Sequence, residues 1–269
     1  MGIINLTPDS FYDGGKWENQ NQIYENLKNW EKAGVKYVDV GCESSRPGSK
    51  KITISQETER LNEFLEVLKD FPNLIFSIDT SKPQVAHLAL KNGFSIVNDI
   101  YGGGINGEMF EIVKSFNAKI VIMHMKGDPE DMQVSPSYSD VVEEIKSFFS
   151  KKINLAISKG LTVNRLILDP GIGFGKRIVD NDKILGSLDK LKSFGIPLLI
   201  GCSRKSFLSI NKDKPEERLS TSLAAMTISI LKGAKIIRVH DVEESIKVKS
   251  FIERYMASNL SNMEIEHEC

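Results

Sequence analysis

Eight short apolar runs recur at intervals along the 269-residue chain. They are rich in β-branched residues and almost continuous in apolar character, which is typical of parallel strands buried on both faces. The pattern therefore predicts eight strands. They cover residues 2–5, 35–41, 73–79, 94–99, 118–124, 166–169, 197–201 and 234–240.

Between most of these runs lies an amphipathic stretch long enough for a helix. The stretch 17–34 ends at Gly34, which is a natural helix stop. The stretch 55–71 carries an apolar stripe behind a partial capping box, in which Ser55 stands three residues before Thr58. Further helices are expected near residues 82–92, 106–117, 138–159, 181–194, 216–232 and 242–257.

The alternation of strands and helices predicts the architecture. Eight strand–helix units in about 250 residues suit a (β/α)8 TIM barrel. No Pro/Ser-rich linker or low-complexity block divides the sequence, so we expect one α/β domain over residues 1–269. A doubly wound sheet is the structural alternative.

Composition narrows the range of partners. The chain is 41% hydrophobic, enough for a full core, and its net charge of −1 gives no reason to expect nucleic acid or an anionic membrane. No apolar run approaches 18 residues, and the first residues do not form a signal segment. The three cysteines have no metal or redox spacing, which favours the reducing cytoplasm.

The run "LILDPGIGFGKR" (166–177) ends in three glycines and looks like a phosphate-binding loop. A P-loop requires a glycine where Pro170 stands and Ser or Thr where Arg177 stands. A dinucleotide fingerprint requires a third glycine where Lys176 stands. Both motifs fail, so the stretch binds something else or is a glycine-rich turn.

Polar residues follow most of the predicted strands, at the end where a barrel carries its active site. Asp79, Asn98 and Asp169 come directly after buried apolar runs, where an unpaired carboxylate is costly. Three such groups facing one cavity suit a ligand that offers several N–H donors along one edge. A pyrimidinone with an exocyclic amine is such a ligand.

A cationic group is expected on strands seven and eight, the quadrant where barrels commonly hold phosphate. Arg238 and His240 alternate along one strand end and so share a face, and Lys205 follows strand seven. The turn 203–207 is expected to open a helix, whose free N–H groups favour an anion.

Eight segments together resemble the dihydropteroate synthase family, in order and with suitable spacing. The match covers essentially the whole chain, and the ordered set is very specific although single pieces such as "MHM" are weak. The segments are "MGIINLTPDSFYDGG" (1–15), "DVGCESSRPGS" (39–49), "SIDT" (77–80), "IVNDI" (96–100), "MHM" (123–125), "DPGIGFGK" (169–176), "SRKSF" (203–207) and "RVHDV" (238–242).

The resemblance implies a transferase of folate biosynthesis. It would join 6-hydroxymethyl-7,8-dihydropterin pyrophosphate to p-aminobenzoate and release pyrophosphate, with Mg²⁺ as cofactor. Such enzymes are usually homodimers, and a helix face near the C-terminus is the expected contact. The pyrophosphate would leave the pterin methylene carbon, and the neutral aniline nitrogen would then attack without a covalent enzyme intermediate.

By the same resemblance, the pterin edge is recognised by Asp79, Asn98 and Asp169. Lys205 lies on the same ring system, and Met123 packs nearby. Asp79 and Asp169 would stabilise the cationic pterin, and the catalytic set is Lys205, Arg46, Asp79 and Asp169.

The remaining implied roles concern the anion and p-aminobenzoate. Arg238 and His240 would hold the pyrophosphate, and Asn5 would help to bind Mg²⁺. Ser206 would face the carboxylate of p-aminobenzoate, and Phe174 would pack beside its ring. A mobile loop would close over the anion and shape the p-aminobenzoate site with Ser45, Arg46 and Pro47.

The chain departs from the family pattern at three points. It begins inside the first motif, so we expect either a short first strand or the removal of an upstream domain; Cys42 stands where glycine is common, and Ser45 where threonine is usual. Three alternatives stay open: a thiol nucleophile at Cys42 or Cys202, a pterin-binding methyltransferase domain, and a non-catalytic pterin-binding barrel. The last two have no evident use for Lys205 and the Arg238–His240 pair.

Overall fold

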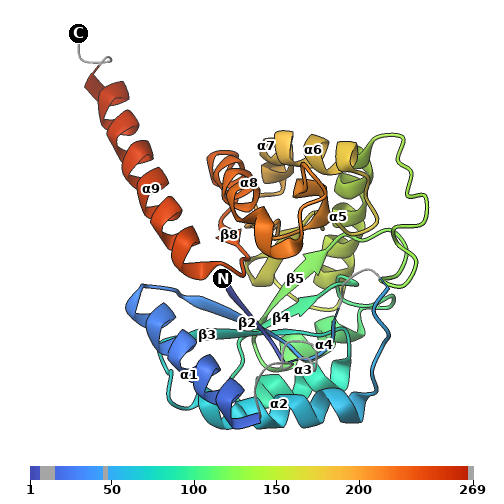
Figure 1. The fold of residues 1–269 in the computed structure, drawn as a ribbon. Helices are drawn as coiled ribbons and strands as arrows, with labels where there is room; N and C mark the ends of the chain where they lie inside the picture. The colour runs from blue at the N-terminus through green and yellow to red at the C-terminus, as the bar shows by residue number, and fades with distance from the viewer. Residues whose placement is uncertain (7–15, 45–47, 266–269) are drawn as a thin grey trace.

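The computed structural model describes residues 1–6, 16–44 and 48–265, in which strands and helices alternate (Figure 1). Six strands pair in parallel and in chain order, and two more pair with each other. The first six are β1 (Gly2–Asn5), β2 (Tyr37–Gly41), β3 (Ile75–Asp79), β4 (Ile96–Asp99), β5 (Lys119–Met123) and β6 (Leu166–Asp169). The last two are β7 (Leu199–Ile200) and β8 (Ile236–Ile237).

Single bridges join the two groups of strands at both seams. Leu168 on β6 bridges Leu198 just before β7, and Gly2 on β1 bridges Val239 just after β8. The second seam is reinforced by the amide of Ile3, which donates to the carbonyl of Val239 at 3.1 Å. The strands therefore close into a (β/α)8 barrel, as the hydrophobic pattern predicted.

Each stretch predicted to be helical contains a helix. The helices are α1 (Lys16–Lys32), α2 (Ile54–Leu68), α3 (Pro83–Lys91), α4 (Glu108–Ser115), α5 (Val141–Ser158), α6 (Ile178–Gly186), α7 (Leu188–Leu191), α8 (Leu219–Leu231) and α9 (Val242–Ile265). The predicted helix 181–194 is divided into three pieces, which are α6, α7 and a 3-10 turn at Lys192–Phe194. Helix α9 continues beyond the predicted end at 257 and projects from the barrel (Figure 1). No described helix combines the length and the apolar character needed to cross a membrane.

The start of α2 differs from the prediction. Ser55 and Thr58 do not form the capping box, because the helix begins at Ile54 and Ser55 already lies in its first turn. The cap is Thr53, whose hydroxyl accepts from the amide of Gln56 at 3.2 Å, while the Gln56 side chain accepts from the amide of Thr53 at 2.9 Å. This reciprocal pair satisfies two amides that the helix itself leaves free.

The barrel has two apolar layers, because side chains alternate between the faces of a strand. The outer layer packs the strands against the helices, with Phe76, Phe110 and Phe149 among its fully buried side chains. The inner layer fills the floor of the barrel with the buried side chains of Ile96, Val121, Ile167 and Leu199. Two residues further along β4 and β6, the same inner face carries Asn98 and Asp169.

Candidate active site

Strand register brings the predicted polar residues together at the mouth of the barrel. Asn5 pairs with Gly41, Gly41 with Asp79, and Asp79 with Asn98. A Cβ atom added to Gly41 would lie 3.4 Å from Asn5 Oδ1 and 3.8 Å from Asp79 Oδ2. These two side chains therefore converge over Gly41, next to Asn98.

Arg238 connects this row to a carboxylate that sequence reasoning did not single out. Its Nε donates to Asp39 Oδ2 at 2.6 Å, and its Nη2 donates to Asp79 Oδ2 at 2.8 Å. Asn98 Nδ2 donates to the same oxygen of Asp39 at 2.9 Å. Burial raises the pKa of Asp79 to about 7, and the positive charge of Arg238 opposes this rise.

Asp39 is a buried site residue with one unsatisfied oxygen. It lies two residues before Gly41 on β2, so both face the interior of the barrel. Its Oδ1 has no hydrogen-bond partner, and neither does the buried hydroxyl of Ser77, which pairs with it in register on β3. The signal in the sequence was a carboxylate between two valines of a buried strand, a position that is costly unless the charge is paired.

The glycine-rich turn after β6 packs too closely against neighbouring backbone to hold side chains at Gly171 and Gly175. Gly171 has a φ of +66° and donates to Asp169 Oδ1 at 2.7 Å, and a Cβ there would lie 1.9 Å from the carbonyl oxygen of His124. A Cβ on Gly175 would lie 2.1 Å from the carbonyl oxygen of Lys126. Bare backbone is therefore required because the turn packs directly against the backbone that follows β5.

Lys205 and Phe174 meet beside this turn. The Lys205 ammonium donates to the carbonyl of Ile172 and lies 4.5 Å from the centre of the Phe174 ring. Burial lowers the pKa of Lys205 to about 8, and the nearby charge of Asp169 opposes this change. Burial likewise raises the pKa of Asp169, opposed first by Lys205. Met123 also belongs to this side of the mouth, since it pairs with Asp169 in register and is buried.

The turn 203–207 does not open a long helix, so that prediction was wrong. Ser206 begins a 3-10 turn that ends at Leu208, and helix α8 starts only at Leu219. A turn of three residues lacks the aligned free amides of a helix N-terminus. The side chain of Ser206 is exposed at this turn.

His240 and Arg238 share a strand end but have different partners. The backbone amide of His240 donates to the Ser203 hydroxyl at 3.2 Å, and its Nδ1 lies 3.1 Å from the same oxygen. Arg238 is instead balanced by two carboxylates. The Arg238 and His240 side chains are therefore held by separate sets of contacts.

The predicted residues Ser45, Arg46 and Pro47 lie outside the described residues. On the far side of this gap, the amide of Gly48 donates to the carbonyl of Pro129 at 3.0 Å. This bond ties the chain after the gap to the segment that follows β5.

An ion cluster anchors the chain before the same gap. Lys82 Nζ lies 2.7 Å from Glu43 Oε2 and 2.6 Å from Glu57 Oε2. Glu43 also accepts from the amide of Ile52 at 2.6 Å. The segment that leaves β2 is thus fastened to α2 and to the start of α3.

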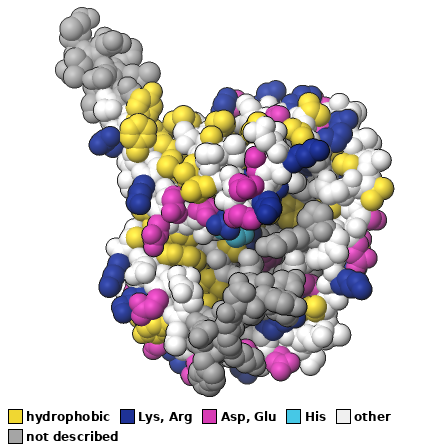
Figure 2. All heavy atoms as spheres, viewed as in Figure 1, with side chains coloured by type: hydrophobic (Ala, Val, Ile, Leu, Met, Phe, Trp, Pro, Cys, Tyr) yellow, Lys and Arg dark blue, Asp and Glu magenta, His cyan; other side chains and the backbone are white. Residues whose placement is uncertain are grey.

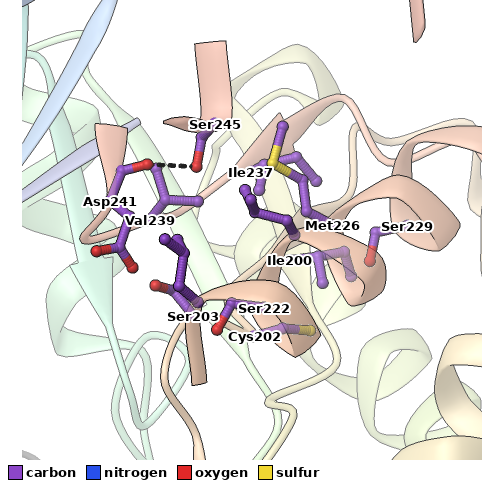
Figure 3. A pocket seen from close by; sticks show the side chains of 12 residues that line it. Ile200, Cys202, Ser203, Ser222, Met226, Ser229, Ile237, Val239, Asp241 and Ser245 are labelled. Carbon is purple, nitrogen blue, oxygen red and sulfur yellow. Dashed lines mark hydrogen bonds between the residues drawn. The ribbon is translucent and has the colours of Figure 1, made fainter. Parts of the chain in front are cut away.

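Cavities of very different size lie among the described residues near the mouth. A cavity of about 690 Å³ opens beside β2, β3 and β4, and of the predicted site residues that the structure describes, Asp79 alone lines it. That volume falls in the range of small-molecule sites. A cavity of about 10 Å³ lies between β7, β8 and α8, lined by Cys202 and Met226 among others (Figure 3). It has room for about one water molecule.

Acidic and basic side chains are interspersed on the face shown in Figure 2.

The two described cysteines are poor candidates for a nucleophile. Cys42 and Cys202 are buried free thiols, and burial raises the pKa of each to about 12. The thiolate is the reactive form of cysteine. The thiol mechanism left open by the sequence is therefore disfavoured.

Magnesium has no ready-made cage among the described residues. They contain no group of three or more His, Cys, Asp or Glu side chains suited to a metal ion. Mg²⁺ is, however, usually held by one or two protein groups together with substrate phosphates and water. The carboxamide oxygen of Asn5 beside Asp79 fits that kind of site.

Carboxylates, an amide and cations gathered at the C-terminal mouth of a closed barrel define a TIM-barrel enzyme. A sequence model of the pterin binding enzyme family matches residues 1–240. Dihydropteroate synthase of Synechocystis sp. is 38% identical over 250 residues, which cover 92% of this chain and 86% of that protein.

Solved structures give the same result. Dihydropteroate synthase of Yersinia pestis, in a sulfonamide drug complex, has a TM-score of 0.89 at 36% identity, covering 96% of this chain and 94% of that one. The enzyme of Xanthomonas albilineans with 4-aminobenzoic acid has a TM-score of 0.86 at 34% identity, covering 96% and 92%. The chain therefore belongs to the dihydropteroate synthase family, whose members are pterin-binding transferases of folate biosynthesis.

Proposed function

We propose that this chain condenses 6-hydroxymethyl-7,8-dihydropterin pyrophosphate with p-aminobenzoate, giving 7,8-dihydropteroate and pyrophosphate. One observation carries the proposal beyond family membership. Asp39 Oδ1 and the hydroxyl of Ser77 are buried side by side in the barrel without hydrogen-bond partners. Buried polar atoms are normally satisfied, so the carboxylate oxygen suits a ligand that brings an N–H donor into the barrel, and the hydroxyl can accept from or donate to the same ligand.

The pterin is recognised by its donor edge. Asp79 and Asp169 end β3 and β6, Asn98 is the last residue but one of β4, and each offers an oxygen to the ring N–H and amino groups. Lys205 contacts the same ring system, and Met123 provides an apolar surface. Support for this arrangement comes from the burial of both carboxylates, which strengthens their hydrogen bonds to a bound ligand.

The reaction is a substitution at the methylene carbon of the pterin. The C–O bond breaks as negative charge moves onto the departing pyrophosphate, which Arg238 and His240 hold. Asp79 and Asp169 stabilise the positive charge left on the pterin. The aniline nitrogen of p-aminobenzoate then forms the new C–N bond and loses a proton.

Asn5 is the residue of this chain that would hold Mg²⁺, together with the pyrophosphate of the substrate. The ion supplies charge neutralisation of the leaving group when bound.

The second substrate binds beside the glycine-rich turn. Phe174 packs against the ring of p-aminobenzoate, and Ser206 faces its carboxylate. The proximity of Lys205 to the Phe174 ring supports a shared pocket between the two substrates. The predicted contributions of Ser45, Arg46 and Pro47 remain part of the proposal.

The protein acts as a homodimer in the cytoplasm. Support for a dimer comes from exposed apolar side chains on the last two helices, including Leu231 on α8 and Phe251 and Tyr255 on α9. Figure 2 shows hydrophobic side chains gathered where α9 leaves the barrel. The free thiols of Cys42 and Cys202 agree with a reducing compartment.

An activity assay tests the proposal. The purified chain is incubated with the pterin pyrophosphate, p-aminobenzoate and Mg²⁺, and dihydropteroate is followed by chromatography. Product should form only when both substrates are present. Failure to form dihydropteroate with folded protein would reject the function. Methyl transfer from a methyl-folate to a corrinoid protein would support the methyltransferase alternative instead, and we expect none.

A further inference from the structure

Lys176 closes the glycine-rich turn, and the proposed chemistry assigns it no role. We propose that Lys176 is a positioning residue, whose ammonium group holds the turn 170–175 so that Phe174 and Lys205 face p-aminobenzoate. This inference rests on the proposed function, because it concerns the second substrate of that reaction.

The ammonium group of Lys176 binds three carbonyl oxygens. Nζ donates to Gly171 O at 2.8 Å, to Phe174 O at 2.9 Å and to His124 O at 3.1 Å. The residue is only 3% exposed. Since an ammonium group has three N–H donors, the three carbonyls use all of them. Lys176 thus joins both ends of the turn to the end of β5.

Each carbonyl from Gly171 to Gly175 accepts a hydrogen bond from a side chain. Lys176 donates to two of them, the carbonyls of Gly171 and Phe174. The carbonyl of Ile172 accepts from Lys205, that of Gly173 accepts from Gln133 at 2.7 Å, and that of Gly175 accepts from Tyr138 at 2.8 Å. The position of Lys205 therefore depends directly on the position of the turn.

The turn also carries the ring against which Lys205 packs. Phe174 is fixed by Lys176 through its carbonyl, and its ring centre lies 4.5 Å from Lys205 Nζ. Asp169 is held differently, because it belongs to β6 and its backbone carbonyl accepts from the amide of His124 at 2.9 Å. Loosening the turn should consequently move Phe174 and Lys205 together, while the backbone of Asp169 stays in the barrel wall and its carboxylate loses only the support of the Gly171 amide.

Burying an ammonium group costs free energy, so a lysine at this position needs a compensating interaction. Burial lowers the pKa of Lys176 to about 7, opposed by the charge of Asp169. An apolar side chain of similar length would avoid that cost. An apolar side chain could not, however, donate hydrogen bonds to the three carbonyl groups. Leaving these buried acceptors unpaired would destabilise the conformation of the turn.

The test compares Lys176→Met with Lys183→Met. Methionine keeps much of the aliphatic stem at 176 and removes the donors, whereas Lys183 is an exposed lysine on α6 whose ammonium lies 3.8 Å from Asp140. We expect Lys176→Met to raise the KM for p-aminobenzoate roughly tenfold and to lower kcat, as follows from unsatisfied buried acceptors. Pterin binding by calorimetry should weaken by a smaller factor, because Lys205 moves with the turn whereas Asp79 and Asn98 lie on other strands, and Lys183→Met should match the wild type in every measurement.

Hydrogen exchange of the peptide covering 170–175 gives a readout that does not depend on activity. It should accelerate in Lys176→Met and stay unchanged in Lys183→Met. If the wild type makes no dihydropteroate, the proposed function fails, while unchanged exchange would overturn the positioning role by itself. A loss of kcat with an unchanged KM would also overturn it, because that pattern indicates a smaller fraction of folded enzyme.

A milder variant covers the case in which Lys176→Met does not fold. Tyr138→Phe removes only the bond to the carbonyl of Gly175, at the other end of the same turn. It should raise the KM for p-aminobenzoate in the same direction by a smaller factor, with faster exchange over 170–175. An unchanged KM together with unchanged exchange would contradict the proposal.

Discussion

Replacing Arg238 by methionine tests the charge balance at the centre of the site. The substitution leaves Asp39 and Asp79 without the cation that contacts both of them at 2.6 and 2.8 Å. The Asp39 side chain is fully buried and that of Asp79 is 13% exposed, so water cannot replace the guanidinium group easily. Removing one partner of a buried ion pair typically costs about 3–5 kcal/mol. We expect a loss of that size in the free energy of unfolding, which is a large part of the 5–15 kcal/mol typical of proteins.

The loss should depend on pH in a defined direction. Asp79 has a folded pKa of about 7, above its unfolded value of 3.8, so the folded state binds more protons between these values. Its contribution to stability therefore falls as the pH rises from about 4 to about 7. Arg238 lowers this pKa, so without it the fall should extend above pH 7. Arg238→Met should be more destabilised at pH 8 than at pH 5.

Urea unfolding at both pH values measures this effect, with Lys69→Met as the control. Lys69 also makes two bonds to one carboxylate, that of Glu66, but the two side chains are 67% and 79% exposed. Pairs of that kind contribute about 1 kcal/mol or less. If Arg238→Met lost no more stability than Lys69→Met, or lost the same amount at pH 5 and pH 8, the buried charge balance would be refuted.

Three further predictions concern single residues at the mouth. Asp169→Asn should weaken pterin binding by about 1–3 kcal/mol in calorimetry and slow turnover, because an amide presents a donor to the donors of the ligand; a folded variant with wild-type affinity and rate would remove Asp169 from the site. The kcat/KM for p-aminobenzoate should fall as the pH rises past about 8, because Lys205 loses its proton there, and Lys205→Met should lack that limb of the profile. Burial lowers the pKa of His124 to about 2, so stability should fall by up to about 1.4 kcal/mol per unit as the pH drops below 6.5, where the unfolded histidine gains a proton. His124→Phe should flatten this acid limb in urea unfolding, and an unchanged slope would exclude His124 as its source.

The strand ends were predictable from the sequence for a simple geometric reason. Parallel strands with the same direction bring their C-terminal ends to one rim, whichever helix connects them. Asp79, Asn98 and Asp169 each follow an apolar run directly, so the polar residue that ends the run is also the one at the rim. Local pattern was sufficient here because only the order along each strand mattered.

The pairing between these groups was not predictable in the same way. Arg238 contacts Asp39 across 199 residues of sequence, and this contact depends on how β8 and β2 face each other once the barrel has closed. The sequence suggested Arg238 as part of a cationic group with Lys205 and His240. In the folded chain its first partners are carboxylates, because the interior of a barrel joins strands that are not neighbours.

At the start of α2, two residues of suitable type competed for the N-cap position, Thr53 and Ser55. The N-cap is the one whose neighbour three positions later can accept a hydrogen bond from its backbone amide. Gln56 does this for Thr53. The turn 203–207 contains Arg204 at a φ of +59°, a conformation that ends a helix and that the residue type did not reveal.

The glycine-rich turn could be interpreted only in part from the sequence. Spacing argued against a P-loop and a dinucleotide fingerprint, but it did not show why the glycines are needed. Gly171 and Gly175 allow close approach of the backbone after β5, at distances that no Cβ could tolerate. The space that the missing side chains leave is filled by the carbonyl oxygens of His124 and Lys126, and the first of these accepts from Lys176. Lys176 also donates to the carbonyls of Gly171 and Phe174 within the turn. The lysine and the glycines of this motif therefore form one structural unit, and that unit positions the residues proposed to bind p-aminobenzoate.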